Sequence, residues 1–227
     1  MDILDVWING GNFYNHPKTL SMKTTIKYLA LAVVVIAALA ASFRTENLTE
    51  KNRRERMLEY KPSQLVEVMF RDSLASLASR AVSIGQLASG INDAEFMAGN
   101  SKVLGIGSPL FLVVRGEMDN PTLIDDELKA TVDGVETNLP LKYIFGNTAR
   151  DASGWFNIDD FRNTPDFNAV SAEMNKYIRT KVIGNKQQNI SQPTHIDFIG
   201  AVGIPADDRN LTTLTVIPYI LKVDNTK

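Results

Sequence analysis

The residues best suited to chemistry lie around the pair Arg150–Asp151, between two predicted secondary-structure elements. A guanidinium held by a neighbouring carboxylate can form paired hydrogen bonds with the carboxylate or phosphate of a ligand. The same pair can instead tie a long loop to the domain through hydrogen bonds to backbone groups. Asn147 and Thr148, which follow Gly146, suit either a polar contact with a ligand or a turn. Both interpretations stay open at the level of sequence.

Aromatic residues follow this pair closely. Trp155, Phe156, Phe161 and Phe167 lie within thirteen residues of one another. Such rings stack on a sugar or a base, or they fill the interior of a domain. We prefer the interior, because aromatic burial dominates core energetics. The candidate ligand-binding residues are Asn147, Thr148, Arg150, Asp151, Trp155, Asp160 and Asn163.

The other titratable residues give weak signals for catalysis. A hydrolase that uses Asp151 with Asp159 or Asp160 is an alternative, and it needs two carboxylates about 5–10 Å apart in a cleft. His195 is the single histidine after residue 21, and one histidine forms neither a common zinc site nor a Ser-His-Asp triad. The chain has no cysteine. We therefore predict no catalytic residue, no metal and no cofactor, in a protein that is not an enzyme.

Hydrophobic periodicity predicts the elements that must position these residues. Apolar residues recur at three- and four-residue steps from Pro62 to Ile84, and Asn92-Asp-Ala-Glu95 predicts the cap of a short helix that ends at Ala98. The later elements are strands at 109–118, 128–132 (within the segment 122–133) and 135–145, an irregular segment at 146–165, a helix at 167–182, and strands at 194–204 and 211–223.

Three strands, a helix and two strands is the order of an oligonucleotide/oligosaccharide-binding (OB) barrel. Asp133-Gly134 predicts a tight hairpin, and Pro218 predicts an edge position or a bulge in the last strand. The expected fold is a mainly β, α+β domain: a small OB-like five-stranded barrel (β-β-β-α-β-β), preceded by a membrane or signal helix and an amphipathic helix. The alternative is an open α+β sheet with both helices on one face.

An apolar segment near the start of the chain predicts export or membrane attachment. Tyr28 to Ala41 is a run of fourteen residues without a charge, and Lys23 and Lys27 precede it. A cleaved secretory signal needs roughly 7–15 apolar residues, whereas a membrane-spanning helix needs about 20. We prefer an uncleaved inner-membrane anchor, residues 28–43, with the domain facing the periplasm. Cleavage and release into the periplasm is the alternative.

The same criteria divide the chain into five parts. Met22-Lys-Thr-Thr-Ile-Lys27 is an ordinary lead for such a segment, so Met22 is the preferred start of translation. The parts are a leader or disordered segment at 1–21, the signal or anchor at 22–43, a charged stalk at 44–61, a helical segment packed on the barrel at 62–104, and the OB-like β domain at 105–227.

Three segments resemble a bacterial family of predicted periplasmic lipoproteins of unknown function. Gly146–Asn163 is similar to its Gly-Thr-Ala-x-Arg-Asp and Phe-x-Asp-Phe-x-Asn motifs, and Val170–Asn175 and Gly105–Glu117 are similar to its next helix and an earlier strand. The resemblance covers roughly Pro62–Val223. It implies no known reaction; some members are encoded beside sugar-transport operons, and one structure was likened to nucleic-acid-binding barrels. This chain departs from the family in an inserted Asn147 and in lacking the lipidated cysteine.

The net charge bears on which class of partner the protein binds. The chain carries a net charge of −2, and residues 110–227 contain 12 Lys and Arg against 16 Asp and Glu. A nucleic-acid binder usually shows a basic excess, so the sequence argues against this partner. We predict an envelope-facing, membrane-anchored accessory or ligand-binding module. Its expected partners are the membrane, through residues 28–43, and an envelope protein, a transport component or a saccharide. The alternatives are oligonucleotide binding and the carboxylate hydrolase.

Overall fold

The computed structural model describes residues 26–27, 30–31, 33–35, 61–105, 107–190, 194–206 and 210–225. The chain divides into two compact units, Met1–Asn47 and Leu48–Lys227. The described residues of the first unit are helical. The predicted anchor at 28–43 lies mainly outside the described residues, as do the predicted leader at 1–21 and stalk at 44–61. Among the described residues, no helix has both the length and the apolar character needed to cross a bilayer.

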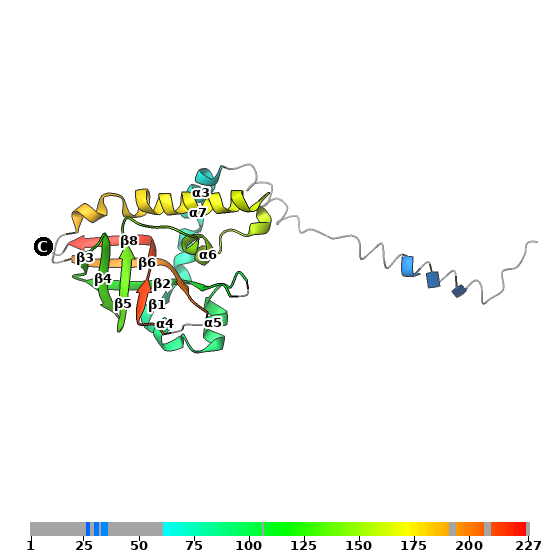
Figure 1. Cartoon of the computed structure of the whole chain (residues 1–227), viewed down its shortest axis with the longest axis horizontal. Coiled ribbons are helices and arrows are strands. Elements are labelled where there is room, and N and C mark those ends of the chain that lie inside the picture. The colour runs from blue at the N-terminus through cyan, green and yellow to red at the C-terminus, as the bar shows by residue number, and fades with distance from the viewer. Residues whose placement is uncertain are drawn as a thin grey trace, which may run out of the picture. The chain divides into compact units, whose positions relative to one another are not determined.

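The second unit is built on two four-stranded sheets (Figure 1). The first sheet has the order β1-β2-β6-β8, with strands β1 (Val82–Ser83), β2 (Leu110–Asp119), β6 (Thr194–Ile204) and β8 (Ile217–Asn225). The second has the order β3-β4-β5-β7, with strands β3 (Thr122–Ile124), β4 (Glu127–Val132), β5 (Val135–Pro140) and β7 (Thr213–Thr215). Neighbouring strands are antiparallel except in the pairs β1–β2 and β5–β7.

Two strands and one hairpin confirm the sequence pattern closely. The predicted strands at 109–118 and 194–204 are β2 and β6, which pair from Leu110 opposite Ile204 to Asp119 opposite His195. Asp133 and Gly134 connect β4 to β5 with φ angles of 49° and 83°. Positive φ at both central residues is the backbone of the tight hairpin turn that the dipeptide predicts.

The predicted five-stranded barrel is not a closed barrel in the described part of the chain, which forms two four-stranded sheets instead. The expected strand at 128–132 lies within β4, whereas the expected strand at 211–223 is divided. Asp125 and Asp126, at φ angles of 54° and 62°, turn the chain between β3 and β4. Val216 alone separates β7 from β8 and carries the chain from the second sheet into the first. The mainly β, α+β class is confirmed. The expected arrangement of all strands in one barrel is not.

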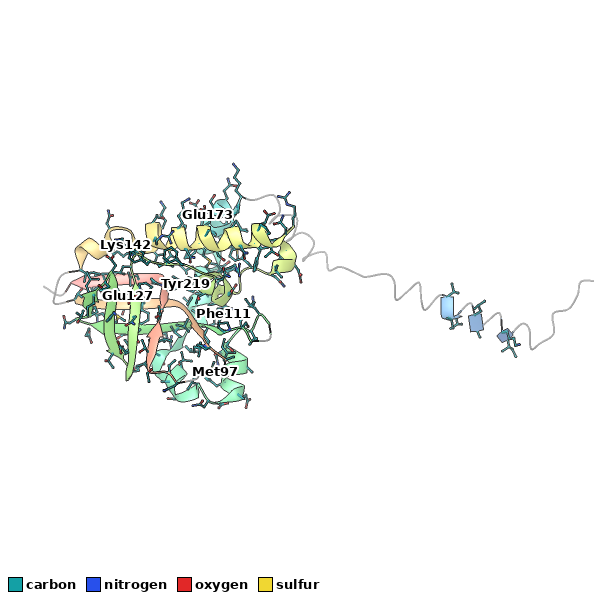
Figure 2. The ribbon with its side chains drawn as sticks, viewed as in Figure 1. Met97, Phe111, Glu127, Lys142, Glu173 and Tyr219 are labelled. Atoms are coloured by element: carbon teal, nitrogen blue, oxygen red, sulfur yellow. The ribbon has the colours of Figure 1, made fainter. Side chains whose placement is uncertain are left out.

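Pro218 lies at both of the positions that the sequence allows. β8 is the terminal strand of its sheet, and its pairing with β6 shifts between Ile199 and Gly200. Tyr219 is the extra residue, because Gly200 lies opposite Pro218 and Ile199 lies opposite Ile220. The side chain of Tyr219 is 1% exposed and lies beneath α7 (Figure 2). The bulge therefore turns a large aromatic ring into the core.

Helices cover the strands from two sides. The helices of this unit are α3 (Pro62–Ser79), α4 (Ile84–Gly90), α5 (Ala94–Asn100), α6 (Thr148–Ser153) and α7 (Thr164–Tyr177), with the shorter turns η1 (Ile158–Asp160), η2 (Ile178–Ile183) and η3 (Gly184–Asn189). In Figure 1, α7 lies along one side of the strands, and α4 and α5 lie on the other.

The predicted helix boundaries need three corrections. α3 begins at Pro62 as expected but ends at Ser79, because β1 and a new helix, α4, follow. The short helix is capped by Asp93 rather than Asn92; its carboxylate accepts from the N–H groups of Glu95 and Phe96 at 2.9 and 3.1 Å. The segment 146–165, expected to be irregular, contains α6 and η1. Propensity did not show α6, since a six-residue helix depends on tertiary packing for its stability.

One hydrophobic core joins helices and sheets. Phe70 of α3 stacks on Tyr177 of α7 with 4.3 Å between ring centres, and meets Trp155 edge-on at 5.2 Å. Trp155, Phe156 and Phe167 are all buried. The preferred interpretation of this aromatic cluster as interior packing is therefore confirmed for these three rings, and Phe161 packs partly buried against them.

Candidate functional site

The Arg150–Asp151 pair lies inside the protein. The side chains are 4% and 5% exposed, and Arg150 Nε donates a hydrogen bond to Asp151 Oδ1 at 2.7 Å. The pair sits on α6, which begins after Asn147 and is followed by its C-cap residue Gly154, with a left-handed φ of 63°. Burying the two groups side by side costs less than burying either alone, because each partly offsets the desolvation of the other.

The Arg150 guanidinium also joins α6 to α7. Its Nη1 donates to the carbonyl of Phe167 at 3.4 Å and to Asn168 Oδ1 at 3.1 Å. Its Cζ lies 3.7 Å from the centre of the Phe167 ring. Protein groups therefore occupy Nε and Nη1, two of the three nitrogens that could donate to a ligand. The geometry agrees with the interpretation in which this pair fixes the segment to the domain.

Four further candidate residues are part of the same packing. Asn163 caps α7 through a hydrogen bond from the Asp166 N–H at 2.8 Å, and Asp160, 5% exposed, accepts from the Asn157 N–H at 3.3 Å. Trp155 is in the core, and Thr148 is half-buried at the start of α6. Asp151 and Asp160 line none of the three cavities described below.

Asn147 is the candidate residue that does line a cavity. A cleft of about 310 Å³ opens at the N-terminal end of α6, between the segment that enters this helix and the side of α7. The residues that matter to its chemistry are Phe145, Asn147, Asn168, Ser171, Asn175 and Arg179. The Asn147 side chain makes no capping hydrogen bond to α6. We refer to this cavity as the α6–α7 cleft.

Two side chains of the α6–α7 cleft are buried with an oxygen atom unpaired. Ser171 and Asn175 are each 5% exposed. Within the described part of the chain three buried side-chain atoms lack a hydrogen-bond partner, and two of them are Ser171 Oγ and Asn175 Oδ1. Leaving such a group unpaired costs about 1–3 kcal/mol. Both oxygens belong to side chains that line the α6–α7 cleft.

The backbone around the α6–α7 cleft is fixed by α7 and η2. Asn175 Nδ2 donates to the carbonyl of Gly146 at 2.9 Å, and Arg179 Nη1 donates to the carbonyl of Ile144 at 2.6 Å. These two bonds hold the segment that enters α6 and leave the Asn175 oxygen as the group without a partner. The cleft is therefore formed before any ligand arrives.

An exposed aromatic pair borders this cleft. Phe145, which lines it, is 71% exposed, and Tyr143 is 60% exposed. Their rings are 6.4 Å apart and inclined by 27°. Sequence reasoning missed both rings because it placed them in a strand at 135–145, whereas β5 ends at Pro140. Proline at that position was the available signal, since it cannot continue a hydrogen-bonded ladder.

A wider groove of about 690 Å³ lies between β2, β6 and β4. Its charged residues are Arg115, Glu117, Asp119, Asp133, Asp197 and Lys222. Four carboxylates against two cations make an acidic lining, which repels the phosphates of a nucleic acid. The groove therefore argues against the oligonucleotide alternative.

His195 lies beside this groove among carboxylates. Its Nδ1 is 2.6 Å from Asp119 Oδ1, and its Nε2 is 3.2 Å from Asp197 Oδ1. The hydrogen bond with Asp119 is the main reason that the pKa of His195 is raised above its ordinary value. Among the described residues, Glu117, His195 and Asp197 bring one possible metal-ligand atom each within 4.8 Å of one another.

A family model described as "Predicted periplasmic lipoprotein (DUF2291)" matches residues 32–222. The chain belongs to this family. The resemblance carried by the three motif segments is therefore confirmed. The function of this periplasmic lipoprotein family is unknown, and its description is consistent with a location in the cell envelope. The sequence contains no cysteine.

The fold comparison agrees with the family assignment. The crystal structure of an OB-fold protein from Thermotoga maritima matches with a TM-score of 0.60 and 19% sequence identity, over 73% of this chain and 99% of that chain. At this identity the likeness shows the fold alone. No curated protein matches the chain. This member of the lipoprotein family therefore has an OB-like architecture, and its function must be argued from its own side chains.

Proposed function

We propose that this protein is a non-enzymatic binding module of the cell envelope that takes a neutral saccharide in the α6–α7 cleft. The observation that carries the proposal is the pair of unpaired oxygens on buried Ser171 and Asn175. Asn175 Oδ1 accepts a hydrogen bond, and the Ser171 hydroxyl both accepts and donates. A sugar hydroxyl also donates and accepts, so one ring with several hydroxyls can pair with both groups once their side chains turn toward the cleft.

The exposed ring of Phe145 supports the same ligand class. One face of a sugar ring is formed mainly by C–H groups, and an aromatic ring provides an apolar surface for it. A cleft with one apolar wall and a few placed polar groups is the usual form of a small-molecule site. Asn147 and Asn168 add amide groups at the same cleft. The polar side chains of the cleft and the ring of Phe145 together favour a sugar over a purely apolar ligand.

The charge of the α6–α7 cleft supports a neutral ligand. Of the six lining residues named above, Arg179 is the charged one, and its Nη1 already donates to the carbonyl of Ile144. Amide and hydroxyl groups make up the remaining polar lining. A strongly charged ligand would find little here that balances its charge, whereas hydroxyl groups pair with amides and hydroxyls.

Saccharide binding to the full-length protein tests the proposal. A glycan array, followed by calorimetry on each hit, should identify a neutral sugar that Phe145→Ala binds roughly tenfold more weakly, which corresponds to about 1.4 kcal/mol. Leu123→Ala is the matched control, because Leu123 is also an exposed apolar residue (46%) but lies on β3. Absence of any sugar hit, or equal affinity of Phe145→Ala and wild type, would contradict the proposal.

Association with a transport component of the envelope is the second part of this proposal. A sugar-binding module that lacks a transport pathway of its own needs a partner to pass the ligand on. Cross-linking in intact cells followed by pull-down should recover an envelope transport protein. Recovery of cytosolic proteins alone would remove this part.

A further inference from the structure

A second cavity lies at the other end of α6. Its volume is about 160 Å³, comparable with a cavity that holds a benzene-sized molecule. The lining residues that matter are Arg80, Asn100, Ser101, Lys102, Ala152 and Gly154. They come from the end of α3, the end of α5 and the end of α6. We refer to it as the basic cavity, because it contains two cationic side chains and no carboxylate among its lining residues.

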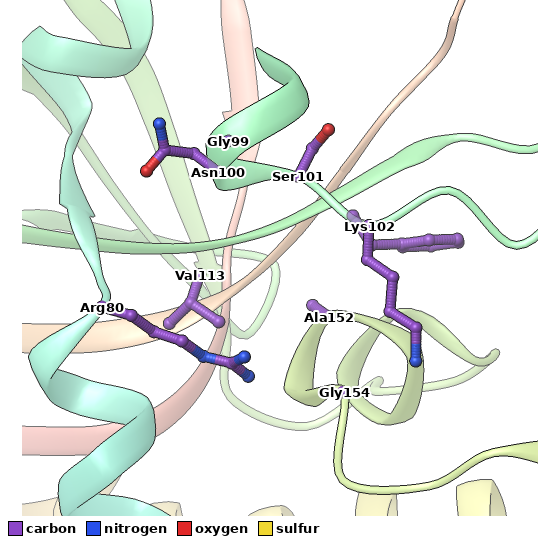
Figure 3. A pocket seen from close by; sticks show the side chains of 9 residues that line it. Arg80, Gly99, Asn100, Ser101, Lys102, Val113, Ala152 and Gly154 are labelled. Carbon is purple, nitrogen blue, oxygen red and sulfur yellow. The ribbon is translucent and has the colours of Figure 1, made fainter. Parts of the chain in front are cut away.

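Lys102 supplies the first cation. Its backbone is fixed on β2 by two hydrogen bonds with Phe111, of 2.8 and 2.9 Å. Its side chain extends toward α6 (Figure 3). Within the described part of the chain, the ammonium group of Lys102 has no hydrogen bond and no ion pair. Burial is the main reason that its pKa is lowered below the ordinary value of lysine.

Arg80 supplies the second cation from the opposite side (Figure 3). Its Nη2 donates a hydrogen bond to the carbonyl of Ser153, which orients the guanidinium toward the end of α6. Gly154 lies against this guanidinium, since a Cβ at this residue would be in ordinary contact with Nη2 and Nη1, at 3.5 and 3.6 Å. Within the described residues, the Arg80 side chain makes one hydrogen bond, to Ser153. The other N–H groups of its guanidinium are therefore available to a ligand.

The charges around the basic cavity do not balance. The groups that act on the pKa of Lys102 are Asp151 and Asp160, which raise it, and Arg80 and Arg150, which lower it. Asp151 is already paired with Arg150 at 2.7 Å. Three cations, including Lys102 itself, therefore face two carboxylates. The surplus positive charge lies on Arg80 and Lys102, which line the cavity from opposite sides (Figure 3).

We propose that the basic cavity is a binding site for a small oxyanion, such as a phosphate or carboxylate group, held between Arg80 and Lys102. A guanidinium offers two parallel N–H donors to such a group, and an ammonium adds a point charge. The size limits the enclosed part of the ligand to about six non-hydrogen atoms, as in benzene. Phosphate, with five, fits this limit. The site is independent of the saccharide proposal, because the two cavities share no lining residue.

Inorganic phosphate is the probe for this site. Titration into the full-length protein, followed by calorimetry at low ionic strength, should give saturable binding. Lys102→Met and Arg80→Met should each weaken it at least tenfold. Lys176→Met is the matched control, because Lys176 lies on α7 with a side chain that is 62% exposed and is outside the basic cavity. Unchanged affinity in both cavity variants, or no binding by the wild type, would overturn the proposal.

Amide chemical shifts of the wild type provide a test that does not depend on the folding of a variant. Phosphate should shift the amide signals of Ser101, Lys102 and Gly154. Shifts confined to other regions would overturn the site. Acetate and a phosphomonoester in parallel titrations distinguish the sources of the oxyanion: preference for the phosphomonoester assigns a phosphorylated ligand, and preference for acetate assigns a carboxylate. Either preference supports the proposed oxyanion chemistry.

Discussion

The two ends of α6 present opposite chemistry, although only six residues separate them. At the N-terminal end, the α6–α7 cleft offers neutral oxygens and an exposed ring. At the C-terminal end, the basic cavity offers a guanidinium and an ammonium group. Between the two ends, Arg150 and Asp151 are buried and paired. The buried pair in the middle thus holds α6 in place, and the residues at its two ends determine which ligands bind.

The middle of α6 should show the largest effect on stability. Asp151→Ala leaves the Arg150 guanidinium buried without its counter-charge, so we expect a loss of roughly 3–5 kcal/mol in the free energy of unfolding. Asp159→Ala, at an exposed residue of η1, should change this energy by less than about 0.5 kcal/mol. Urea unfolding followed by circular dichroism measures both. If Asp151→Ala were as stable as the wild type, the buried pair in the middle of α6 would not be what holds this helix in place.

A substitution at one end of α6 should weaken the binding of one ligand and leave the other ligand's affinity unchanged. Lys102→Met should weaken phosphate binding at least tenfold and leave the affinity for a saccharide unchanged, and Phe145→Ala should do the reverse. The reason is that no residue lines both cavities. Calorimetry of each variant with each ligand measures the effect. A variant that weakened both ligands would show that α6 couples its two ends, which would replace the comparison of independent sites.

Replacing Ser171 should raise the stability of the protein and weaken its saccharide binding. Ser171→Ala removes a buried hydroxyl that has no partner, so we expect a gain of about 1 kcal/mol in the free energy of unfolding, together with weaker saccharide binding. Thermal unfolding and calorimetry measure the two effects on the same sample. Ser73→Ala on α3 is the control, since its half-buried hydroxyl lies outside both cavities. A loss of stability in Ser171→Ala would mean that this hydroxyl is satisfied in the free protein.

Alkaline pH should distinguish the two ends further. Because the pKa of Lys102 is lowered, its ammonium group loses its proton below the ordinary lysine value of about 10.4. Phosphate affinity should therefore fall as pH rises toward that value, whereas saccharide affinity should not change. Lys102→Arg should retain phosphate binding at the higher pH, because arginine stays charged. Calorimetry at several pH values measures this, and a flat profile in the wild type would exclude Lys102 as the cation.

A smaller pH effect is expected at the edge of the acidic groove. The pKa of His195 is raised by its bond with Asp119, so its contribution to stability is complete below the unfolded pKa of about 6.5 and is lost as pH rises through the folded value. His195→Gln should remove this part of the pH dependence. Thermal unfolding between pH 5 and about 8 measures it. An identical pH profile in wild type and variant would contradict the assignment.

The sequence predicted the elements better than the way in which they join. β2, β6 and the Asp133-Gly134 hairpin follow from local pattern and turn chemistry. The division into two sheets depends on Val216, and nothing about a single valine predicts that it changes sheets. The family motif pointed to α6, but seven residues chosen for ligand contact include one, Asn147, that lines a described cavity.

The residues of the two cavities were missed for physical reasons. Ser171 and Asn175 lie on a helix whose sequence shows only amphipathic spacing, and their lack of partners depends on the segment packed against them. Arg80 and Lys102 are far from Ala152 and Gly154 along the chain, so only tertiary packing brings them to one cavity. Sequence pattern carries local information, whereas these sites arise from contacts between distant segments.

The outer margin of β8 also bears on how this protein behaves at high concentration. Pro218 lacks an N–H group, Tyr219 bulges out of register, and Lys186 Nζ donates to the carbonyl of Leu221 at 2.8 Å. The proline removes a donor, the lysine occupies an acceptor, and the bulge distorts the edge that a strand from another molecule would need to pair with. This side of the sheet is consequently protected against the edge-to-edge growth that leads to fibrils.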